Sequence, residues 1–234
     1  MIRRFVPVLL IAASCFALVA PGAAAATTTD KQVARAGVLV QSDFPTGWTT
    51  KARAKTPDSV LDAAAAKIAS CKPFIAFSKA NKNNPRAKSP NFDHEQANVT
   101  NTVSVYASDT KAEASIRTFS DARMPECLQK LFNAVYEKQL EQDKKTAAQV
   151  TSVTTAIAPV ADVRIGNEAV SYQGTVDIGL KDGTTQTVGI RFAATRVGKA
   201  VAGYSWTSDT DISATLQPAI VTSVKRLQDA QATG

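Results

Sequence analysis

The sequence predicts an α+β fold: an antiparallel β-sheet, a meander of about five or six strands, flanked by helices and joined by one disulfide. Three observations support this. Apolar residues recur at every second position over much of residues 151–206, which is typical of strands. Segments before and after this stretch carry apolar residues three or four positions apart, which is typical of helices. Turn sequences containing glycine separate the alternating stretches. We expect one apolar face of the sheet, covered by helices that include the last one.

Two helices separated by a turn are predicted first. Residues 31–41 place apolar side chains on one helical face, and the segment Asp43–Trp48 (Asp-Phe-Pro-Thr-Gly-Trp) is typical of a tight turn, because proline and glycine suit its positions. The second helix begins with Thr56 as its cap and Pro57 at its first position. Its apolar stripe ends near Cys71.

The middle of the chain alternates between polar and periodic segments. Asparagine, proline and lysine recur over Lys79–Gln96, which predicts a long loop. Valines then alternate with polar residues over Ala97–Tyr106, which predicts a half-buried strand. We expect two further helices, one over Asp109–Phe119 and one after Pro125 with Cys127 on its apolar side.

The clearest strand of the chain is Val170–Leu180, and Val188–Ala194 returns beside it. Asp182 and Gly183 between them predict a hairpin, because this dipeptide tolerates the positive φ of a type I′ turn. A second turn leads into the strand Ala200–Trp206.

A helical apolar stripe ends the chain. Ile212, Leu216 and Leu227 lie on it, and Pro218 is expected to kink the helix or to mark where its main part begins.

The first 26 residues are predicted to be a cleavable secretory signal peptide. Arg3 and Arg4 form a positive start, Phe5–Ala20 is an apolar run, and Ala23–Ala26 offers small residues to signal peptidase. Cleavage near Ala26 leaves residues 27–234 as a single extracellular domain. Two alternatives stay open: an uncleaved anchor helix, and lipidation at Cys15, which the apolar residues after it disfavour.

The composition after the leader argues against several classes of protein. No later segment is apolar for long enough to span a membrane, which takes about 20 residues. The whole chain has a formal charge of +7, and the basic excess that is left without Arg3 and Arg4 is spread among acidic residues. Such a surface does not predict nucleic-acid binding and suits general affinity for anionic envelope polymers.

Cys71 and Cys127 are the cysteines that remain after removal of the leader. Outside the cytoplasm, an isolated pair is most simply a disulfide. A redox-active pair, the alternative, would favour a Cys-x-x-Cys spacing, which this chain lacks.

No motif for catalysis, metal binding or nucleotide binding appears. His94 is the single histidine and lies in the predicted polar loop, whereas metal sites need several converging ligands. No serine lies in a Gly-x-Ser-x-Gly turn and no glycine-rich phosphate loop is present. We therefore predict no cofactor and no enzymatic activity, although a hydrolase with paired carboxylates stays open.

Two sets of residues are candidates for binding. The first is a basic loop that is either a solvated segment or a contact for anionic glycans or lipid headgroups; its residues are Lys79, Lys82, Arg86 and Lys88. The second is a set of aromatic residues that either fill the core or line a ligand cleft; it contains Trp48, Tyr204 and Trp206.

The opening of the domain, Val38-Leu39 followed by Asp43–Trp48, resembles that of the actinobacterial PknH-like extracellular sensor domains, which occur on receptor kinases and as free-standing secreted proteins. The order of the later elements, with Cys71 after a helix and Cys127 in another, is also similar. The resemblance spans most of residues 33–228. It implies a helix-flanked antiparallel sheet with a ligand-binding groove, and family members commonly carry a second disulfide for which this chain has no cysteines.

The favoured hypothesis is a secreted, non-enzymatic, sensor-like domain that binds a small molecule, a lipid or an envelope component. An envelope hydrolase with paired carboxylates and a structural protein that contacts cell-wall polymers are the alternatives. An apolar cleft with few acids favours the first, two facing carboxylates the second, and a flat basic surface the third.

Overall fold

The computed structural model describes residues 28–53, 58–161 and 165–232. The predicted leader, with Cys15, and the predicted helix start at Thr56 and Pro57 lie outside these residues. The helices are α1 (Thr28–Ala36), η1 (Gln41–Asp43), α2 (Asp58–Ala65), η2 (Ala69–Cys71), α3 (Lys72–Asn81), α4 (Asp109–Phe119), α5 (Met124–Gln142), α6 (Lys144–Ala147) and α7 (Ser213–Ala232). The strands are β1 (Thr49–Lys51), β2 (Arg86–Lys88), β3 (Asn91–His94), β4 (Ala97–Val105), β5 (Val150–Val160), β6 (Glu168–Leu180), β7 (Thr185–Val197) and β8 (Ala200–Ser208).

The predicted α+β class and antiparallel sheet are confirmed. Within the described residues, eight strands form one sheet in the order β1-β3-β4-β8-β7-β6-β5, and β2 pairs with β4 beside β3. The count exceeds the predicted five or six. Strands β1, β2 and β3 have only three or four residues each, which is too short for an alternating pattern to stand out in the sequence.

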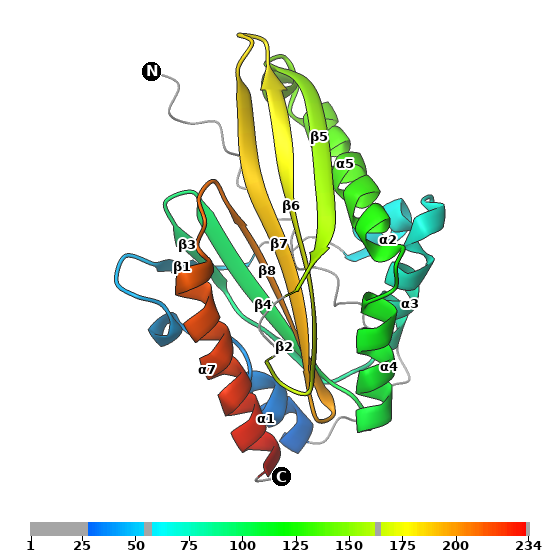
Figure 1. The fold of residues 1–234 in the computed structure, drawn as a ribbon, viewed down its shortest axis with the longest axis vertical. Coiled ribbons are helices and arrows are strands. Elements are labelled where there is room, and N and C mark those ends of the chain that lie inside the picture. Colours follow the sequence, from blue (N-terminus) through cyan, green and yellow to red (C-terminus); the bar gives the residue numbers. More distant parts are fainter. Residues whose placement is uncertain (1–27, 54–57, 162–164, 233–234) are drawn as a thin grey trace.

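Helices cover both faces of the sheet (Figure 1), so the prediction of a single apolar face is wrong. Helices α1 and α7 pack on one face, where Tyr204 and Trp206 of β8 join a core with Leu216 and Leu227. Helices α2, α3, α4 and α5 pack on the other face; there Val176 and its neighbours contact α5. We name these the α7 face and the α5 face.

The register between β7 and β8 shows which residues of these strands face α7 and which face α5. Tyr204 lies opposite Ala193, and Trp206 lies opposite Arg191. Directly opposed residues share a face of a sheet, whereas neighbours along a strand alternate. The apolar residues of β8 therefore share their face with the odd-numbered residues of β7, and Ile190 faces the other way, into the core beneath α5.

The segment predicted as a loop over Lys79–Gln96 contains regular structure, and that prediction is wrong. Helix α3 ends within it, and β2 and β3 both pair with β4. Tertiary hydrogen bonds explain why polar residues form strands here: Ser89 accepts the backbone N–H of Asn101 at 2.8 Å, and Asn81 accepts the hydroxyl of Tyr106. The sequence pattern does not indicate these hydrogen-bond partners, because they come from other segments of the chain.

The Cys71–Cys127 disulfide is confirmed. It joins the end of η2 to α5, with 4.7 Å between the two Cα atoms, and both residues are fully buried. The bond fixes α2 and α3 to α5 and so holds the helical layer of the α5 face together. Over the described part of the chain, no helix combines the length and the hydrophobicity that a bilayer span requires.

The β6–β7 hairpin lies where it was predicted, but its turn is of another type. Gly183 donates to the carbonyl of Leu180 at 3.0 Å and has φ +83°, while Asp182 is not among the described residues with positive φ. A type I′ turn needs positive φ at both central residues, so this turn has the pattern of a type I turn followed by a left-handed glycine. Asp182 instead accepts the N–H of Thr184 at 3.0 Å.

Candidate functional site

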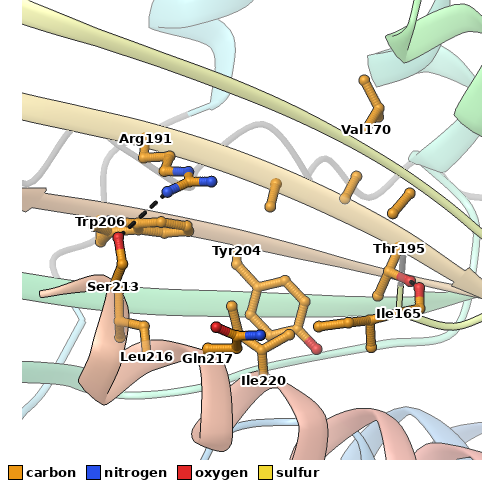
Figure 2. Close-up of a pocket in the computed structure, with 13 residues that line it drawn as sticks. Ile165, Val170, Arg191, Thr195, Tyr204, Trp206, Ser213, Leu216, Gln217 and Ile220 are labelled. Atoms are coloured by element: carbon orange, nitrogen blue, oxygen red, sulfur yellow. Dashed lines mark hydrogen bonds between the residues drawn. The ribbon is translucent and has the colours of Figure 1, made fainter. Parts of the chain in front are cut away.

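A pocket of about 150 Å³ lies on the α7 face, between the strands β6, β7 and β8 and the first half of α7 (Figure 2). Most of its lining is apolar, and its polar side chains are few. The lining residues are Ile165, Ala169, Val170, Arg191, Ala193, Ala194, Thr195, Tyr204, Trp206, Ser213, Leu216, Gln217 and Ile220. A concave apolar surface with a few polar groups is the usual composition of a small-molecule site.

Tyr204 contributes a wall of this pocket, and its hydroxyl is engaged elsewhere. The hydroxyl lies 3.0 Å from Oγ of Ser223 in α7, and Ser223 in turn donates to the carbonyl of Gly37 at 2.6 Å. Burial raises the pKa of Tyr204 well above its ordinary value. The phenol is thus neutral and held by α7, so it offers the pocket its ring and not an acid or a base.

One end of the pocket is built from Arg191, Trp206 and Ser213. The guanidinium carbon of Arg191 lies 5.3 Å from the centroid of the Trp206 ring, which is a cation–π distance. Nη1 of Arg191 donates to Oγ of Ser213 at 3.3 Å, the dashed line beside Trp206 in Figure 2. This arrangement holds a positive charge against an apolar wall at the start of α7.

The environment of Arg191 disfavours its charge. Removal of hydration lowers the pKa of Arg191 below its ordinary value, and the negative charge of Asp211 opposes this effect. Among the described residues that line the pocket, Arg191 is charged and none is acidic. Arg191 thus brings a partly desolvated guanidinium to the described part of the lining.

Ile165, which precedes β6, and Thr195 of β7 lie at the other end of the pocket. The hydroxyl of Thr195 donates to the carbonyls of Ile165 and Glu168. This bond ties Ile165 to β7, and its apolar side chain lies beside that of Ile220 of α7 in Figure 2. The described residues at this end therefore present apolar surface, because the hydroxyl of Thr195 already bonds to the backbone.

The structure brings together two of the three aromatic residues singled out from the sequence. Tyr204 and Trp206 line the pocket, and Trp48 is not among its lining residues. Trp48 stacks instead on His94, with 5.4 Å between ring centroids, and against Phe44 at 4.8 Å. Trp48 therefore belongs to the apolar core of the α7 face, and half-buried His94 stacks on its ring at the β1–β3 edge of the sheet.

The basic residues do not form a loop. Lys79 lies in the last turn of α3 and Lys82 just after it, whereas Arg86 and Lys88 belong to β2. Arg86 lies opposite Ser104 and Lys88 opposite Thr102 in β4, on the face of the sheet away from the pocket. The set is divided between a helix end and a strand, and it takes no part in the pocket.

Sequence reasoning missed the residues that give the pocket its polarity. Arg191 lies within a strand of alternating apolar residues, and only its pairing with Trp206 shows that it faces α7. Ser213 follows Ile212 at the start of the apolar stripe of the last helix and has no distinctive pattern. Among the residues with described positions, no group of three or more His, Cys, Asp or Glu side chains could hold a metal ion.

Comparisons with known proteins do not assign the chain to a family. No family model matches it, and no curated protein matches its sequence. A similar solved structure is the extracellular domain of PknH from Mycobacterium tuberculosis, which is 12% identical, with a TM-score of 0.37 over 60% of this chain and 63% of that chain. The match thus spans less than two thirds of that domain. A TM-score below 0.5 does not establish a shared fold, so membership in the sensor-domain family stays a prediction.

Proposed function

We propose that this chain is an exported, non-enzymatic domain that binds a small molecule, a lipid or another envelope component in the pocket between β7, β8 and α7. The observation that carries the proposal is the composition of the pocket. Its walls are the rings of Tyr204 and Trp206 and aliphatic side chains of α7, and Arg191 and Ser213 stand at one end. Such a site orients a ligand by one polar end and encloses the rest.

The pocket favours binding over hydrolysis. A glycoside hydrolase that works with two carboxylates needs them on either side of the bond, about 5 to 10 Å apart. No Asp or Glu is among the residues with described positions that line this pocket. The hydroxyls of Tyr204 and Thr195 are held by Ser223 and by backbone carbonyls, so neither is placed as a nucleophile beside a base.

Export is the second part of the proposal. The buried Cys71–Cys127 disulfide suits an oxidising compartment, where such bonds persist. The sequence of residues 1–26 supports the same conclusion, since it has the three regions of a signal peptide. N-terminal sequencing of the protein from culture medium should begin near Thr27; cytoplasmic protein that still starts at Met1 would contradict export.

The binding function is tested by the molecules that accompany the purified protein. We would compare wild type with Ala193→Phe, which places a large ring in the pocket, by mass spectrometry of extracted small molecules. Ala158→Phe is the matched control, because Ala158 is exposed on the edge strand β5. A compound enriched with wild type and with the Ala158→Phe control but absent from Ala193→Phe supports the proposal. Equal recovery from all three proteins would place binding elsewhere.

A further inference from the structure

We propose that this pocket selects an uncharged, compact and mostly apolar molecule, about the size of a six-membered ring, which it recognises by shape against the rings of Tyr204 and Trp206. This inference rests on the proposed binding function and adds the chemical class of the ligand. Three features of the pocket support it: the protein partners that its polar side chains already have, the small residue on its floor, and its volume.

Arg191 is held by partners from two other elements. Its Nε donates to Oγ of Ser171 in β6 at 3.5 Å, and its Nη1 donates to Oγ of Ser213 in α7 at 3.3 Å. The guanidinium carbon also lies 5.3 Å from the centroid of the Trp206 ring. Arg191 thus joins β6 to α7 across Trp206. A ligand that bound to this guanidinium would have to displace contacts that the folded protein already makes.

The charge of Arg191 is also partly offset by that of Asp211. Hydrogen bonds from Ser213, helped by the positive charge of Arg191, lower the pKa of Asp211. An anion at this end would therefore meet the Asp211 carboxylate together with a guanidinium that already has partners, and a cation would meet the guanidinium. A charged group that enters the pocket also loses hydration, which costs free energy unless a counter-charge replaces it. The pocket therefore favours uncharged molecules over ions of either sign.

The other polar side chains of the described lining are neutral. The hydroxyl of Tyr204 pairs with that of Ser223, and the hydroxyl of Thr195 donates to two backbone carbonyls. Gln217 is exposed, so its amide is in contact with water. A neutral hydroxyl or carbonyl on a ligand suits such surroundings, because it needs no counter-charge.

A small side chain on β7 creates the hollow. Ala193 lies opposite Tyr204 of β8 and opposite Ser171 of β6, so these three residues share the α7 face. The methyl group of Ala193 leaves space beside the Tyr204 ring, and Leu216 and Ile220 of α7 line that space from the helix side (Figure 2). Aromatic rings pack well against other rings, offset or edge to face. A flat ring is therefore the shape that this wall favours.

The volume limits the size of the ligand. A dry apolar cavity of about 150 Å³ accepts benzene, and this pocket has about the same volume. A six-membered ring or a short branched chain fits this space, and a long acyl chain would have to extend out of it.

Four probes that share one ring separate charge from shape: toluene and benzyl alcohol, which are neutral, anionic benzoate and cationic benzylamine. Each would be titrated into the full secreted chain with its disulfide, followed by NMR of the two tryptophan indole N–H signals. Trp48→Phe assigns the signals. We expect the Trp206 signal to shift, and the two neutral probes to bind at least about tenfold more tightly than either ion, because desolvation of a charge costs more than that factor.

Variants of the floor and the helix test the fit. Ala193→Val should weaken toluene binding several-fold, and Ala193→Leu should abolish it, because the added carbons fill the hollow. Ile220→Ala should enlarge the pocket and raise the affinity for indole, a larger neutral ring, relative to toluene by at least about threefold. Val221→Ala is the matched control: Val221 is the next residue of α7, is 47% exposed and is not among the described lining residues.

Benzoate or benzylamine binding as tightly as toluene would overturn this inference, and so would the absence of toluene binding at millimolar concentration. If the Ala193 variants do not fold, Ile220→Ala decides, and a ratio of indole to toluene affinity equal to that of Val221→Ala counts against the inference. The proposed function fails separately. A charged co-purified compound that is lost in Ala193→Phe would keep the binding function and refute an uncharged ligand, whereas equal recovery from wild type, Ala193→Phe and Ala158→Phe would remove the binding function itself.

Discussion

Arg226 of α7 forms a two-point ion pair with Asp43 of the opening turn, with Nη1–Oδ1 at 2.6 Å and Nη2–Oδ2 at 2.8 Å. The same guanidinium donates to the carbonyls of Ala36 at 3.1 Å and Val38 at 2.9 Å. The hydrogen bonds to Asp43 raise the pKa of Arg226. The aspartate of the Asp-Phe-Pro-Thr-Gly-Trp segment thus fixes the start of the domain to its last helix, the helix that covers the pocket.

We expect Arg226→Ala to lower the free energy of unfolding by about 2 kcal/mol, because it leaves the carboxylate of Asp43, only 3% exposed, without its cation. Urea unfolding measures the change. Arg123→Ala is the matched control, since Arg123 pairs with Asp121 on the surface and is 54% exposed; its loss should cost less than about 1 kcal/mol. Equal effects of the two variants would contradict a structural role for the Arg226 pair.

Replacement of both Cys71 and Cys127 by alanine should lower the free energy of unfolding by about 4 kcal/mol in the chain-entropy model, since the two cysteines are 56 residues apart. Denaturant unfolding of wild type with and without reductant measures the same quantity. Peptide mapping without reductant should recover the two cysteine peptides linked. Two free thiols in secreted protein would refute the assignment.

Gly183→Val should destabilise the β6–β7 hairpin by about 1 to 2 kcal/mol. A Cβ at Gly183 would meet no atom within 4 Å, so the cost arises from its φ of +83° alone. Gly183→Asn should lose less stability than Gly183→Val, because asparagine tolerates the left-handed region of backbone conformation. Lys181→Val in the same turn controls for the added β-branched side chain, and a melting temperature of Gly183→Val equal to that of Lys181→Val would argue against backbone strain.

Ligand binding in the pocket should change the fluorescence of Trp206 and not that of Trp48, which stacks on His94 outside the lining. Titration of Trp48→Phe with a ligand should therefore retain the spectral change, and titration of Trp206→Phe should lose it. A change that survives in Trp206→Phe would locate the ligand away from the pocket. Weak dependence of the affinity on salt would further separate this site from the exposed lysines Lys79 and Lys88, whose contacts salt screens.

The tyrosines of the native protein should resist ionisation. Burial raises the pKa of all four, that of Tyr106 and that of Tyr172 to about 12, with Tyr136 and Tyr204 also raised. Ultraviolet absorbance of tyrosinate should stay low at pH 10.5 in buffer and appear in concentrated urea. Because the folded state holds these protons more tightly than the unfolded chain, the free energy of unfolding should fall as the pH rises above about 10. Normal titration in buffer would contradict this burial.

Local chemistry was enough to predict much of the fold. The period of hydrophobicity marks β6, β7, β8 and α7, because each element buries one side and a strand and a helix repeat differently. The position of the β6–β7 hairpin follows from Asp182 and Gly183, since glycine accepts a backbone conformation that other residues resist. The disulfide could be predicted because Cys71 and Cys127 are the pair of cysteines that remains after the predicted leader. Each of these inferences needs only residues close in sequence or a pair without competitors.

Only the tertiary structure decided which face each strand presents and where the pocket lies. Alternation shows that Tyr204 and Trp206 share a side of β8, but only their packing with Leu216 and Leu227 shows that this side meets α7. The register of β7 with β8 brings Arg191 beside Trp206, and the return of α7 brings Ser213 to both. A side chain's neighbours across a sheet come from distant segments of the chain. The alternation of side chains along one strand looks the same whichever face of the sheet a given helix covers. The pocket and its lining are therefore properties of the register and not of any local motif.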